Sequence, residues 1–538
     1  MRRTTKLAPL AAALVVLTAC GGSGGGGNAS TDVAGGEPKA GGELTVLEDA
    51  GFAGSWPTGL DPATNTTGGA NLDMNQAVYG GLFLLEADDD GSNAGVRPNQ
   101  AESLTMSSDN KTMTLKLKDG ITFSDGTPLD AQAVVWNWQR DMTSTCSCKP
   151  QWRLDGDPSS AITVVDPLTV QVKYSQPFGT ALSNFPVSNV NWIASPAAVQ
   201  KQGPDDFKVN PVGAGPFTVV TNQLSSSLVL QKNPAYFKKG LPYLDKLTFQ
   251  TIGGDQPAYQ ALQAGQGQAY IGLATAPLLD QAQSNSQLQT TVMPATSPYV
   301  VQLNTQAAPF DNPKARQAIY AATDWNAITK GLFKGKYPVS ESFTAPGGLF
   351  YHKDVDGYQD FDLAKAKQLV QEVGGITITL RTTAIYTATQ VMTALQTQWE
   401  KAGIKVEIEG QQLNQVIQSF TSGNWSAFLQ TAGAWDPAAG VGVAFRFSST
   451  APFSGVKDTS LDDLLNQASA TSDATQRDEL YQQAAEKIAQ NWYAPFGLAF
   501  APANIAAKGV HGPGLTTKVP ALAVNTQPMW DRVWKAQS

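Results

Sequence analysis

The sequence predicts a mixed α/β protein of several domains, and three observations carry that prediction. The chain has 538 residues, of which 42% are hydrophobic, and at roughly 100–200 residues per domain this length fits two to four domains with buried cores. Alternating apolar residues typical of strands occur close to apolar stripes at helical spacing. A strand–helix–strand pattern at 376–409 indicates two parallel strands joined by a right-handed crossover.

The N-terminus has the pattern of a secretory signal followed by a tether. Basic residues at positions 2, 3 and 6 precede the apolar run 7–19, which is shorter than the ~20 residues that span a bilayer. The run ends in the tetrapeptide LTAC at 17–20, which resembles a bacterial lipobox. We therefore expect a signal peptide at 1–19, a lipid on Cys20 and a lipid-anchored, Gly-rich tether at 20–42. The alternative is an ordinary cleaved signal with a chance cysteine.

Periodicity predicts local elements along the body. Leu115 and Leu117 alternate with lysines, and the turn at 119–120 predicts a hairpin with residues 121–123. Asp130 can cap a helix whose buried face includes Val134 and Trp138.

The clearest unit is the stretch 376–409. Alternating apolar residues at 376–380 and 404–408 predict two strands, and Val391, Leu395 and Trp399 form the stripe of a helix between them. Gly403 stands where helices often end on a left-handed glycine. Two further apolar stripes, at 461–468 and 480–488, predict a pair of helices near the C-terminus.

Composition excludes several classes of function. The net charge is −8 and no basic stripe offers contacts to phosphates, so we expect no nucleic-acid partner. The chain has two histidines, His352 and His511, and three cysteines. No zinc motif can be written with them, so we expect no metal and no cofactor. A histidine-based catalytic triad would have only these two candidates, and we expect no catalytic residues.

Cys146 and Cys148 form a Cys-x-Cys pair in a chain with a secretory signal. Oxidising compartments favour disulfides, but a ring this small is uncommon, so both the bridged and the free state stay open. The bridged form would staple the loop at 143–150. A redox-active or metal role would need more ligands than the sequence contains.

Segments spread over nearly the whole body resemble one family in their order and spacing. They are GLDP at 59–62, VYGGLF at 78–83, LKLKDGITFSDG at 115–126, NPVGAGPF at 210–217 and KNPAY at 232–236. Together they are similar to the extracytoplasmic solute-binding proteins of ABC importers, in the family of oligopeptide- and dipeptide-binding proteins (bacterial extracellular solute-binding protein family 5).

The resemblance implies an α/β, two-lobed, periplasmic-binding-protein-like fold with a hinge between the lobes and an extra domain. Lobe I would be discontinuous, at 41–71, 210–297 and 493–538, the extra domain would be 72–209, and lobe II would be 298–492. Ligand would bind between the lobes and drive hinge closure. The resemblance also implies a protein that does no bond chemistry and hands its ligand to the ABC permease subunits. We expect a monomer held outside the cytoplasm on the cell membrane by its lipid.

The resemblance also suggests ligand-binding residues. In peptide-binding relatives, a Trp-rich segment ends in Asp-Pro, and an aspartate four residues before the proline pairs with the α-ammonium of the peptide. Here the segment is AGAWDP at 432–437, and Gly433 stands at the carboxylate position. Trp435 and Asp436 are therefore candidates, with Asp436 as a substitute carboxylate. Further candidates are Tyr299, where relatives enter lobe II near the ligand, and Trp56, Tyr79, Trp152 and Tyr493. Burial in a core is the alternative role for each.

The function stays open among three hypotheses, of which two differ in the ligand and one in the class of protein. An oligopeptide or dipeptide is the family's usual ligand. A carbohydrate is the alternative, because aromatic rings can pack on sugars while polar neighbours bond to hydroxyls. A surface-anchored hydrolase that uses a pair of carboxylates is the alternative from another class.

Overall fold

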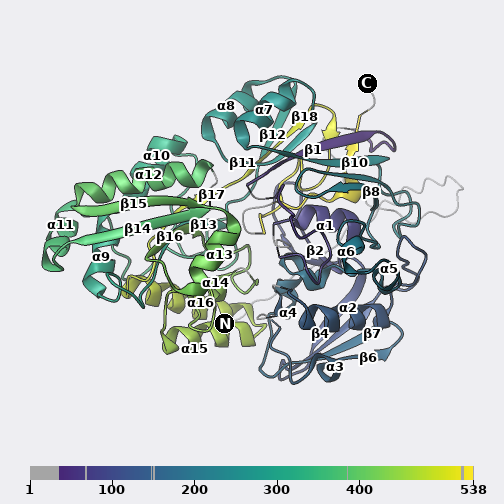
Figure 1. Ribbon diagram of the computed structural model, residues 1–538, viewed down its shortest axis with the longest axis horizontal. Helices are drawn as coiled ribbons and strands as arrows, with labels where there is room; N and C mark the ends of the chain where they lie inside the picture. Colours follow the sequence, from purple (N-terminus) through teal and green to yellow (C-terminus); the bar gives the residue numbers. More distant parts are fainter. Residues whose placement is uncertain are drawn as a thin grey trace, which may run out of the picture. The chain divides into compact units, whose positions relative to one another are not determined.

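The computed structural model describes residues 36–536 except 52, 67–69, 147, 150–151, 384–385, 441 and 523–525 (Figure 1). The predicted signal peptide, Cys20 and most of the tether lie outside the described residues. Residues 38–538 form one unit by their internal contacts. Three main sheets organise it.

A seven-stranded sheet collects strands from three separate stretches of the chain. Its order is β12-β18-β11-β1-β10-β9-β8, and β1 runs parallel to both β10 and β11. The strands are β1 (Glu43–Asp49), β8 (Phe217–Gln223), β9 (Ser227–Lys232), β10 (Lys246–Ile252), β11 (Ala269–Leu273), β12 (Leu288–Val292) and β18 (Ala503–Ala507). These are the stretches expected to form lobe I.

Helices cover both faces of this sheet. On one face, α7 (Asp255–Gln263) and α8 (Ala276–Ser284) bury leucines and alanines with Leu47 and Ile505. On the other face, α1 (Leu72–Tyr79) packs with Val46 and Phe249. Alternate residues of β1 thus serve two cores, as the pleat of a strand requires.

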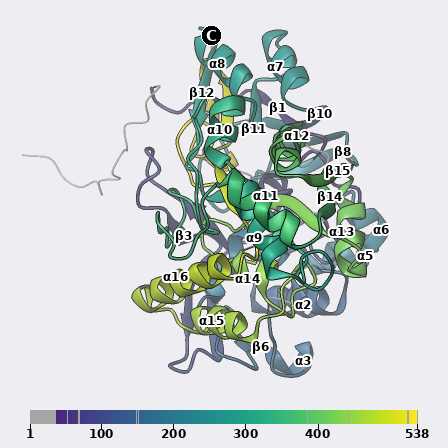
Figure 2. The same ribbon diagram turned by 90° about the vertical axis from the view of Figure 1, so that its left-hand side faces the viewer.

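A five-stranded sheet has the order β15-β14-β16-β13-β17 (Figure 1), and its strands β14 and β15 are also seen in Figure 2. Its strands are β13 (Ser297–Leu303), β14 (Ile376–Thr383), β15 (Ile404–Gln411), β16 (Ala427–Thr431) and β17 (Phe496–Phe500). The predicted strand–helix–strand unit is confirmed, because β14 and β15 pair in parallel and α12 (Tyr386–Lys401) connects them. Trp399 of the predicted helical stripe is fully buried, and Gly403 has φ 89°.

Helices also cover both faces of the five-stranded sheet. On one face lie α9 (Pro313–Ala322), α10 (Trp325–Phe333), α11 (Leu363–Glu372) and α12. On the other face lie α13 (Leu413–Ser422), α14 (Val443–Phe447), α15 (Thr459–Ala470) and α16 (Ala474–Gln490). The two helices predicted near the C-terminus are therefore confirmed as α15 and α16.

Two connections join the seven-stranded and five-stranded sheets. The first leads from β12 to β13, and the second leads from β17 back to β18. Strand β17 lies inside the expected lobe I segment 493–538, yet it pairs with β13. The second connection therefore falls after residue 500.

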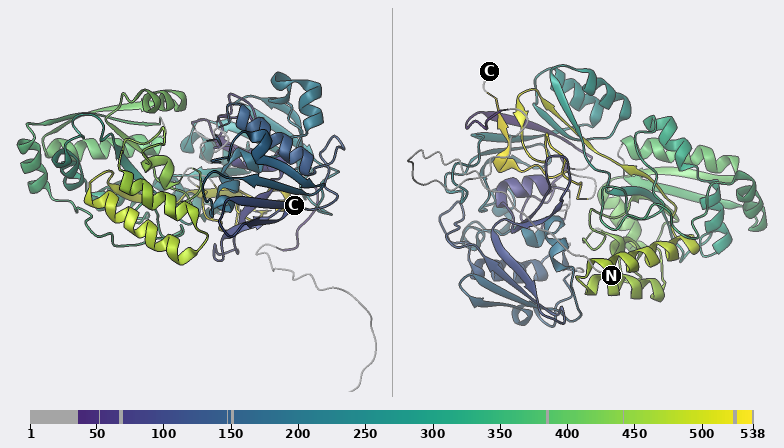
Figure 3. Two further views of the ribbon diagram at one scale, coloured as in Figure 1. Left: turned by 90° about the horizontal axis from the view of Figure 1, so that it is seen from below. Right: turned by 180° about the vertical axis from the view of Figure 1, so that it is seen from behind.

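A four-stranded antiparallel sheet, β4-β5-β7-β6, lies in the stretch expected as the extra domain (Figure 3). Its strands are β4 (Ala101–Met106), β5 (Thr112–Leu117), β6 (Ile162–Asp166) and β7 (Thr169–Lys173), and α2 (Ala131–Thr143) packs on it. The helix cap is confirmed, because the Asp130 carboxylate accepts from the Ala133 amide at 2.9 Å. The predicted hairpin is wrong, because β5 pairs with β4 and β7 while Thr122 makes one isolated bridge to Pro128.

The remaining strands and α-helices of the described chain are short. They are β2 (Phe83–Glu86), β3 (Gly95–Pro98), α3 (Pro158–Ala161), α4 (Ala181–Asn184), α5 (Pro196–Gln202), α6 (Pro204–Phe207), β19 (Val510–His511) and β20 (Trp534–Lys535).

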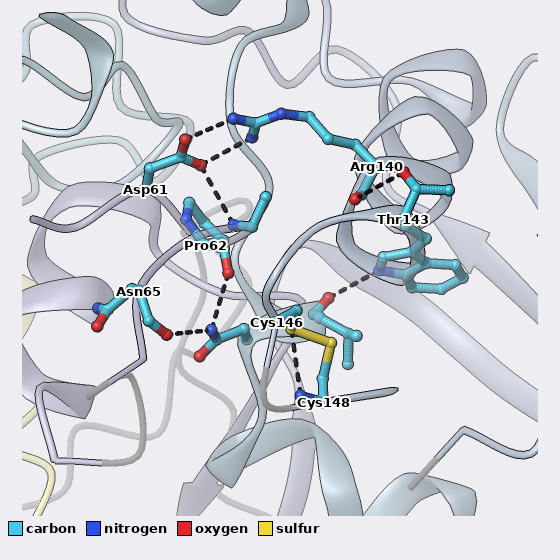
Figure 4. The surroundings of a disulfide bond; sticks show 11 residues. Asp61, Pro62, Asn65, Arg140, Thr143, Cys146 and Cys148 are labelled. Carbon is cyan, nitrogen blue, oxygen red and sulfur yellow. Dashed lines mark hydrogen bonds and ion pairs between the residues drawn. A yellow bond between two sulfur atoms is a disulfide. The ribbon is translucent and has the colours of Figure 1, made fainter. Parts of the chain in front are cut away.

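The loop after α2 contains a disulfide between Cys146 and Cys148, with an S–S distance of 2.04 Å (Figure 4). This bond decides between the two states that the sequence left open. Near it, Arg140 of α2 donates two hydrogen bonds, of 2.7 and 2.5 Å, to the carboxylate of Asp61. Asp61 belongs to the GLDP segment, so this ion pair joins that segment to the last turn of α2, just before the loop that contains the disulfide.

Within the described part of the chain, no helix combines the length and apolar character that a bilayer crossing requires.

Candidate functional site

The segment 432–437 leaves the end of β16, beside the strand that arrives from the seven-stranded sheet. Strand β16 pairs with β13 so that Thr431 lies opposite Tyr299. The Ala432 amide donates to the Pro298 carbonyl at 2.9 Å, and the Ser297 hydroxyl donates to the Ala432 carbonyl. The structure therefore brings Tyr299 and the Trp435 segment to the same end of the five-stranded sheet.

Trp435 packs into the core of the seven-stranded sheet although its backbone leaves the five-stranded one. Its side chain is 7% exposed and belongs to the cluster that contains Leu72 and Leu522. Its carbonyl accepts from the Leu349 amide at 2.8 Å. Trp435 thus connects the loop that follows β16 of the five-stranded sheet to the core of the seven-stranded sheet.

The Asp436 carboxylate is bonded to other groups of the protein. Its carboxylate forms a buried ion pair with Arg477 of α16, accepts from the Ser183 hydroxyl at 2.5 Å and accepts from the Ala438 amide at 2.9 Å. The Arg477 guanidinium lies 4.7 Å from the centre of the Phe350 ring. Burial alone would lower the pKa of Arg477, but the charge of Asp436 raises it above its ordinary value. This carboxylate has little capacity left for the ammonium group of a ligand.

Gly433 is a position that only glycine fits. Its φ is +85°, and a Cβ atom there would lie 2.4 Å from the Phe343 carbonyl oxygen. The left-handed conformation and the contact both exclude a larger side chain. The aspartate that the resemblance led us to expect at this position is therefore excluded by the backbone.

The other candidate residues lie in different surroundings. Trp56 and Tyr79 are fully buried in the same cluster as Trp435, and their polar atoms bond to Asn222 at 2.9 Å and to the Leu60 carbonyl at 2.8 Å. Trp152 is buried in a separate core. Tyr299 is 7% exposed, and burial raises its pKa.

Tyr493 is half-buried beside two charged groups. Its hydroxyl donates to the Asp458 carboxylate at 3.0 Å, and the Arg316 guanidinium lies 5.5 Å from its ring centre. Burial, followed by the hydrogen bond to Asp458, raises the pKa of the Tyr493 hydroxyl to about 12. Tyr493 packs against the core under α14–α16, whereas Trp435 belongs to the core of the seven-stranded sheet.

Two buried carboxyl groups, of Glu48 and Asp73, lie close together where β1 meets α1. Glu48 is the next-to-last residue of β1 and Asp73 is the second residue of α1, and their exposed fractions are 0% and 3%. No ion pair of the described residues includes either of them. Burial raises the pKa of Glu48 well above its ordinary value, and the charge of Asp73 and a hydrogen bond to it add to the rise. Nothing in the sequence marked this pair, because the two residues are 25 positions apart in the chain.

The two histidines contact an aspartate and a tryptophan. The Nε2 atom of His352 lies 2.8 Å from the Asp478 carboxylate, and the ring of His511 stacks on Trp534 with centres 4.6 Å apart. The described residues also contain no group of three His, Cys, Asp or Glu side chains that could hold a metal ion.

Known proteins with similar structures define the class. The structure is similar to that of the periplasmic binding protein DppA of Helicobacter pylori in complex with the peptide STSA, with a TM-score of 0.78 at 21% identity over 93% of this chain and 99% of that one. It is also similar to the oligopeptide-binding protein AppA of Bacillus subtilis in complex with a nonapeptide, with a TM-score of 0.75 at 20% identity over 93% and 100%. The fold is that of a two-lobed periplasmic binding protein.

The sequence places the chain within one family of that class. The family model described as "Bacterial extracellular solute-binding proteins, family 5 Middle" matches residues 95–454. The chain is 31% identical to the glutathione-binding protein GsiB of Escherichia coli (strain K12) over 471 residues, which cover 81% of this chain and 86% of the relative. The chain belongs to solute-binding protein family 5. It is a substrate-binding protein of an ABC importer and not an enzyme, so the hydrolase hypothesis is set aside.

Proposed function

We propose that this protein is a lipid-anchored receptor that captures an oligopeptide or dipeptide between its lobes and delivers it to the ABC permease. Lobe I would comprise 41–71, 210–297 and 493–538 without β17, lobe II would be 298–492 together with β17, and the extra domain would be 72–209. The observation that carries the peptide assignment is the identity of 31% over 471 residues to a glutathione-binding protein. The peptide complexes of the structurally similar DppA and AppA support it.

The cleft would lie where the two sheets are connected. Tyr299 and the segment that carries Trp435 lie at that end of the five-stranded sheet, and the Trp435 side chain belongs to the core of the seven-stranded sheet. An aromatic side chain at such a place can form the wall of a site that closes around a solute. Asp436 supports this wall through its bonds to Arg477 and Ser183 rather than through the ligand.

A carbohydrate is the second candidate, because the structure excludes the aspartate that binds a peptide's ammonium group. Gly433 leaves no room for a side chain beside Phe343, and Asp436 is already paired. A ligand recognised through neutral hydroxyl or amide groups would not need that carboxylate.

The lipid anchor remains part of the proposal. The tetrapeptide at 17–20 would direct cleavage before Cys20 and its acylation. The tether up to residue 42 would hold a monomeric body outside the cytoplasm, close to the permease. Mass spectrometry of the protein extracted from membranes tests this directly, because the mature N-terminal residue must be an acylated Cys20.

Thermal unfolding in the presence of glutathione, dipeptides, oligopeptides and oligosaccharides separates the ligand classes. A solute at 100 times its dissociation constant should stabilise the folded protein by about 2.7 kcal/mol. Stabilisation by a peptide supports the proposal, and stabilisation by oligosaccharides alone replaces it with the second candidate. If no solute of either class has an effect, both candidates fail.

A further inference from the structure

The end of α15 is capped by a distant part of the chain. The last carbonyl groups of a helix have no partner within the helix and need donors from elsewhere. Here the Gly179 amide donates to the Ala470 carbonyl and the Thr180 amide donates to the Ser469 carbonyl, both at 3.3 Å. Asn110, in the turn between β4 and β5, donates to the Ala470 carbonyl at 3.0 Å. All three donors belong to the proposed extra domain, whereas α15 belongs to the proposed lobe II.

Gly179 allows the two segments to approach this closely. A Cβ atom at this position would lie 2.5 Å from the Thr471 carbonyl carbon and 2.6 Å from the Ser472 amide nitrogen. Both are backbone atoms, which cannot turn aside as the end of a long side chain can. The φ of Gly179 is not in the left-handed region, so the contact, and not a turn, requires glycine here.

The same segment also contacts the proposed ligand-binding loop. Four residues after Gly179, the Ser183 hydroxyl of α4 donates to the Asp436 carboxylate at 2.5 Å. Asp436 follows Trp435 directly and is paired with Arg477 of α16. The segment 179–184 therefore contacts both the end of α15 and the loop that carries the candidate aromatic residue.

We propose that the segment 179–184 is a latch, by which the extra domain holds lobe II in the closed position. When lobe II moves away, the carbonyls of Ser469 and Ala470 lose their caps and Asp436 loses the Ser183 hydroxyl. Water can replace these partners, so the latch favours closure modestly and remains reversible. The extra domain would thus take part in the closure of the lobes around the ligand. This inference rests on the closure assumed in the proposed function, but it does not depend on the identity of the ligand.

A cross-linking experiment tests the contact in the full-length protein. The hydroxyl oxygens of Thr180 and Ser469 lie 3.4 Å apart, so the double variant Thr180→Cys/Ser469→Cys should form a disulfide under mild oxidation. The control is Thr180→Cys/Ser460→Cys, because Ser460 is at the other end of α15, about 14 Å along the helix axis. Intact-mass spectrometry measures the rate for each variant, without added solute. A rate no faster than that of the control would overturn the latch.

A glycine substitution then tests the role of Gly179. Adding Gly179→Ala to the double variant should slow cross-linking at least tenfold, because the new methyl group pushes the segments apart. The matched control is Gly253→Ala, since a Cβ atom at Gly253 meets nothing within 4 Å and should leave the rate unchanged. An equal rate with and without Gly179→Ala would overturn the proposal. Because these rates are measured without solute, a failure of the peptide assignment in the thermal experiment leaves them unaffected.

Discussion

Asp436 and Arg477 form an ion pair in which both side chains are almost fully buried, with exposed fractions of 3% and 9%. The pair joins the loop after β16 to α16, and the Phe350 and Tyr481 rings lie against the guanidinium at 4.7 and 5.7 Å. A buried pair of this kind is costly to break, because the remaining charge has no partner. It therefore fixes the loop that carries Trp435.

Asp436→Asn should destabilise the protein strongly. The substitution leaves the buried Arg477 charge uncompensated, and removal of one partner of a buried pair typically costs about 3–5 kcal/mol. Urea denaturation measures the change in the free energy of unfolding. Lys116→Ala is the control, because Lys116 and its partner Glu102 are about half exposed and the loss should be below about 1 kcal/mol. Equal effects of the two substitutions would contradict the assigned role of Asp436.

Trp435→Ala should weaken binding of whichever solute stabilises the protein by at least tenfold, which corresponds to about 1.4 kcal/mol. The reason is the loss of an aromatic wall at the connection between the sheets. Isothermal titration calorimetry measures the affinity, and Trp435→Phe, which keeps a ring, should lose less. Unchanged affinity of a folded Trp435→Ala variant would remove this residue from the site.

Gly433→Ala should be more destabilising than Gly120→Ala. Both glycines have positive φ, +85° and +76°, but a Cβ atom at Gly120 meets nothing within 4 Å whereas one at Gly433 collides with the Phe343 carbonyl. Gly120→Ala therefore measures the conformational cost alone, about 1–2 kcal/mol. Chemical denaturation of both variants gives the difference. If the two costs agree, the backbone at Gly433 can relax, and an aspartate there would be tolerable.

Glu48→Gln should stabilise the protein at neutral pH. The raised pKa of Glu48 means that the folded state keeps a proton that the unfolded state releases. The resulting stability is fully present below the ordinary glutamate pKa and is lost as the pH rises through the raised pKa of the folded protein. The facing groups are Asp73 and Asp49, which are also acidic, and no cation offsets them among the described ion pairs.

Glutamine is neutral at every pH and can donate to Asp73, so the variant should lose less stability between pH 5 and pH 8. Each unit of pKa difference corresponds to about 1.4 kcal/mol, and a gain of at least about 1 kcal/mol at pH 8 is expected from denaturation curves. Glu102→Gln, at the exposed ion pair with Lys116, is the control. A variant with the pH dependence of the original protein would show that Glu48 is ionised when folded.

Local patterns predicted the elements that local interactions build. The strand–helix–strand unit at 376–409 was correct, because its parallel strands adjoin the helix that connects them and Gly403 ends that helix. The helix after Asp130 was correct for the same reason, since its cap is three residues from its donor. The prediction of a hairpin at 115–123 was wrong. Strand β5 pairs instead with β4 and with β7, which lies more than 50 residues further along the chain.

The sequence by itself determined the class of protein, since the order of the family segments and the local periodicities can be recognised without the tertiary structure. The missing carboxylate at position 433 was also visible in the sequence. Only the tertiary structure decided why that carboxylate is missing and what Asp436 does instead. Phe343, Ser183 and Arg477 reach the segment 432–437 from three distant parts of the chain. Contacts of this kind depend on how the sheets and helices pack, and no spacing of residues along the chain encodes them.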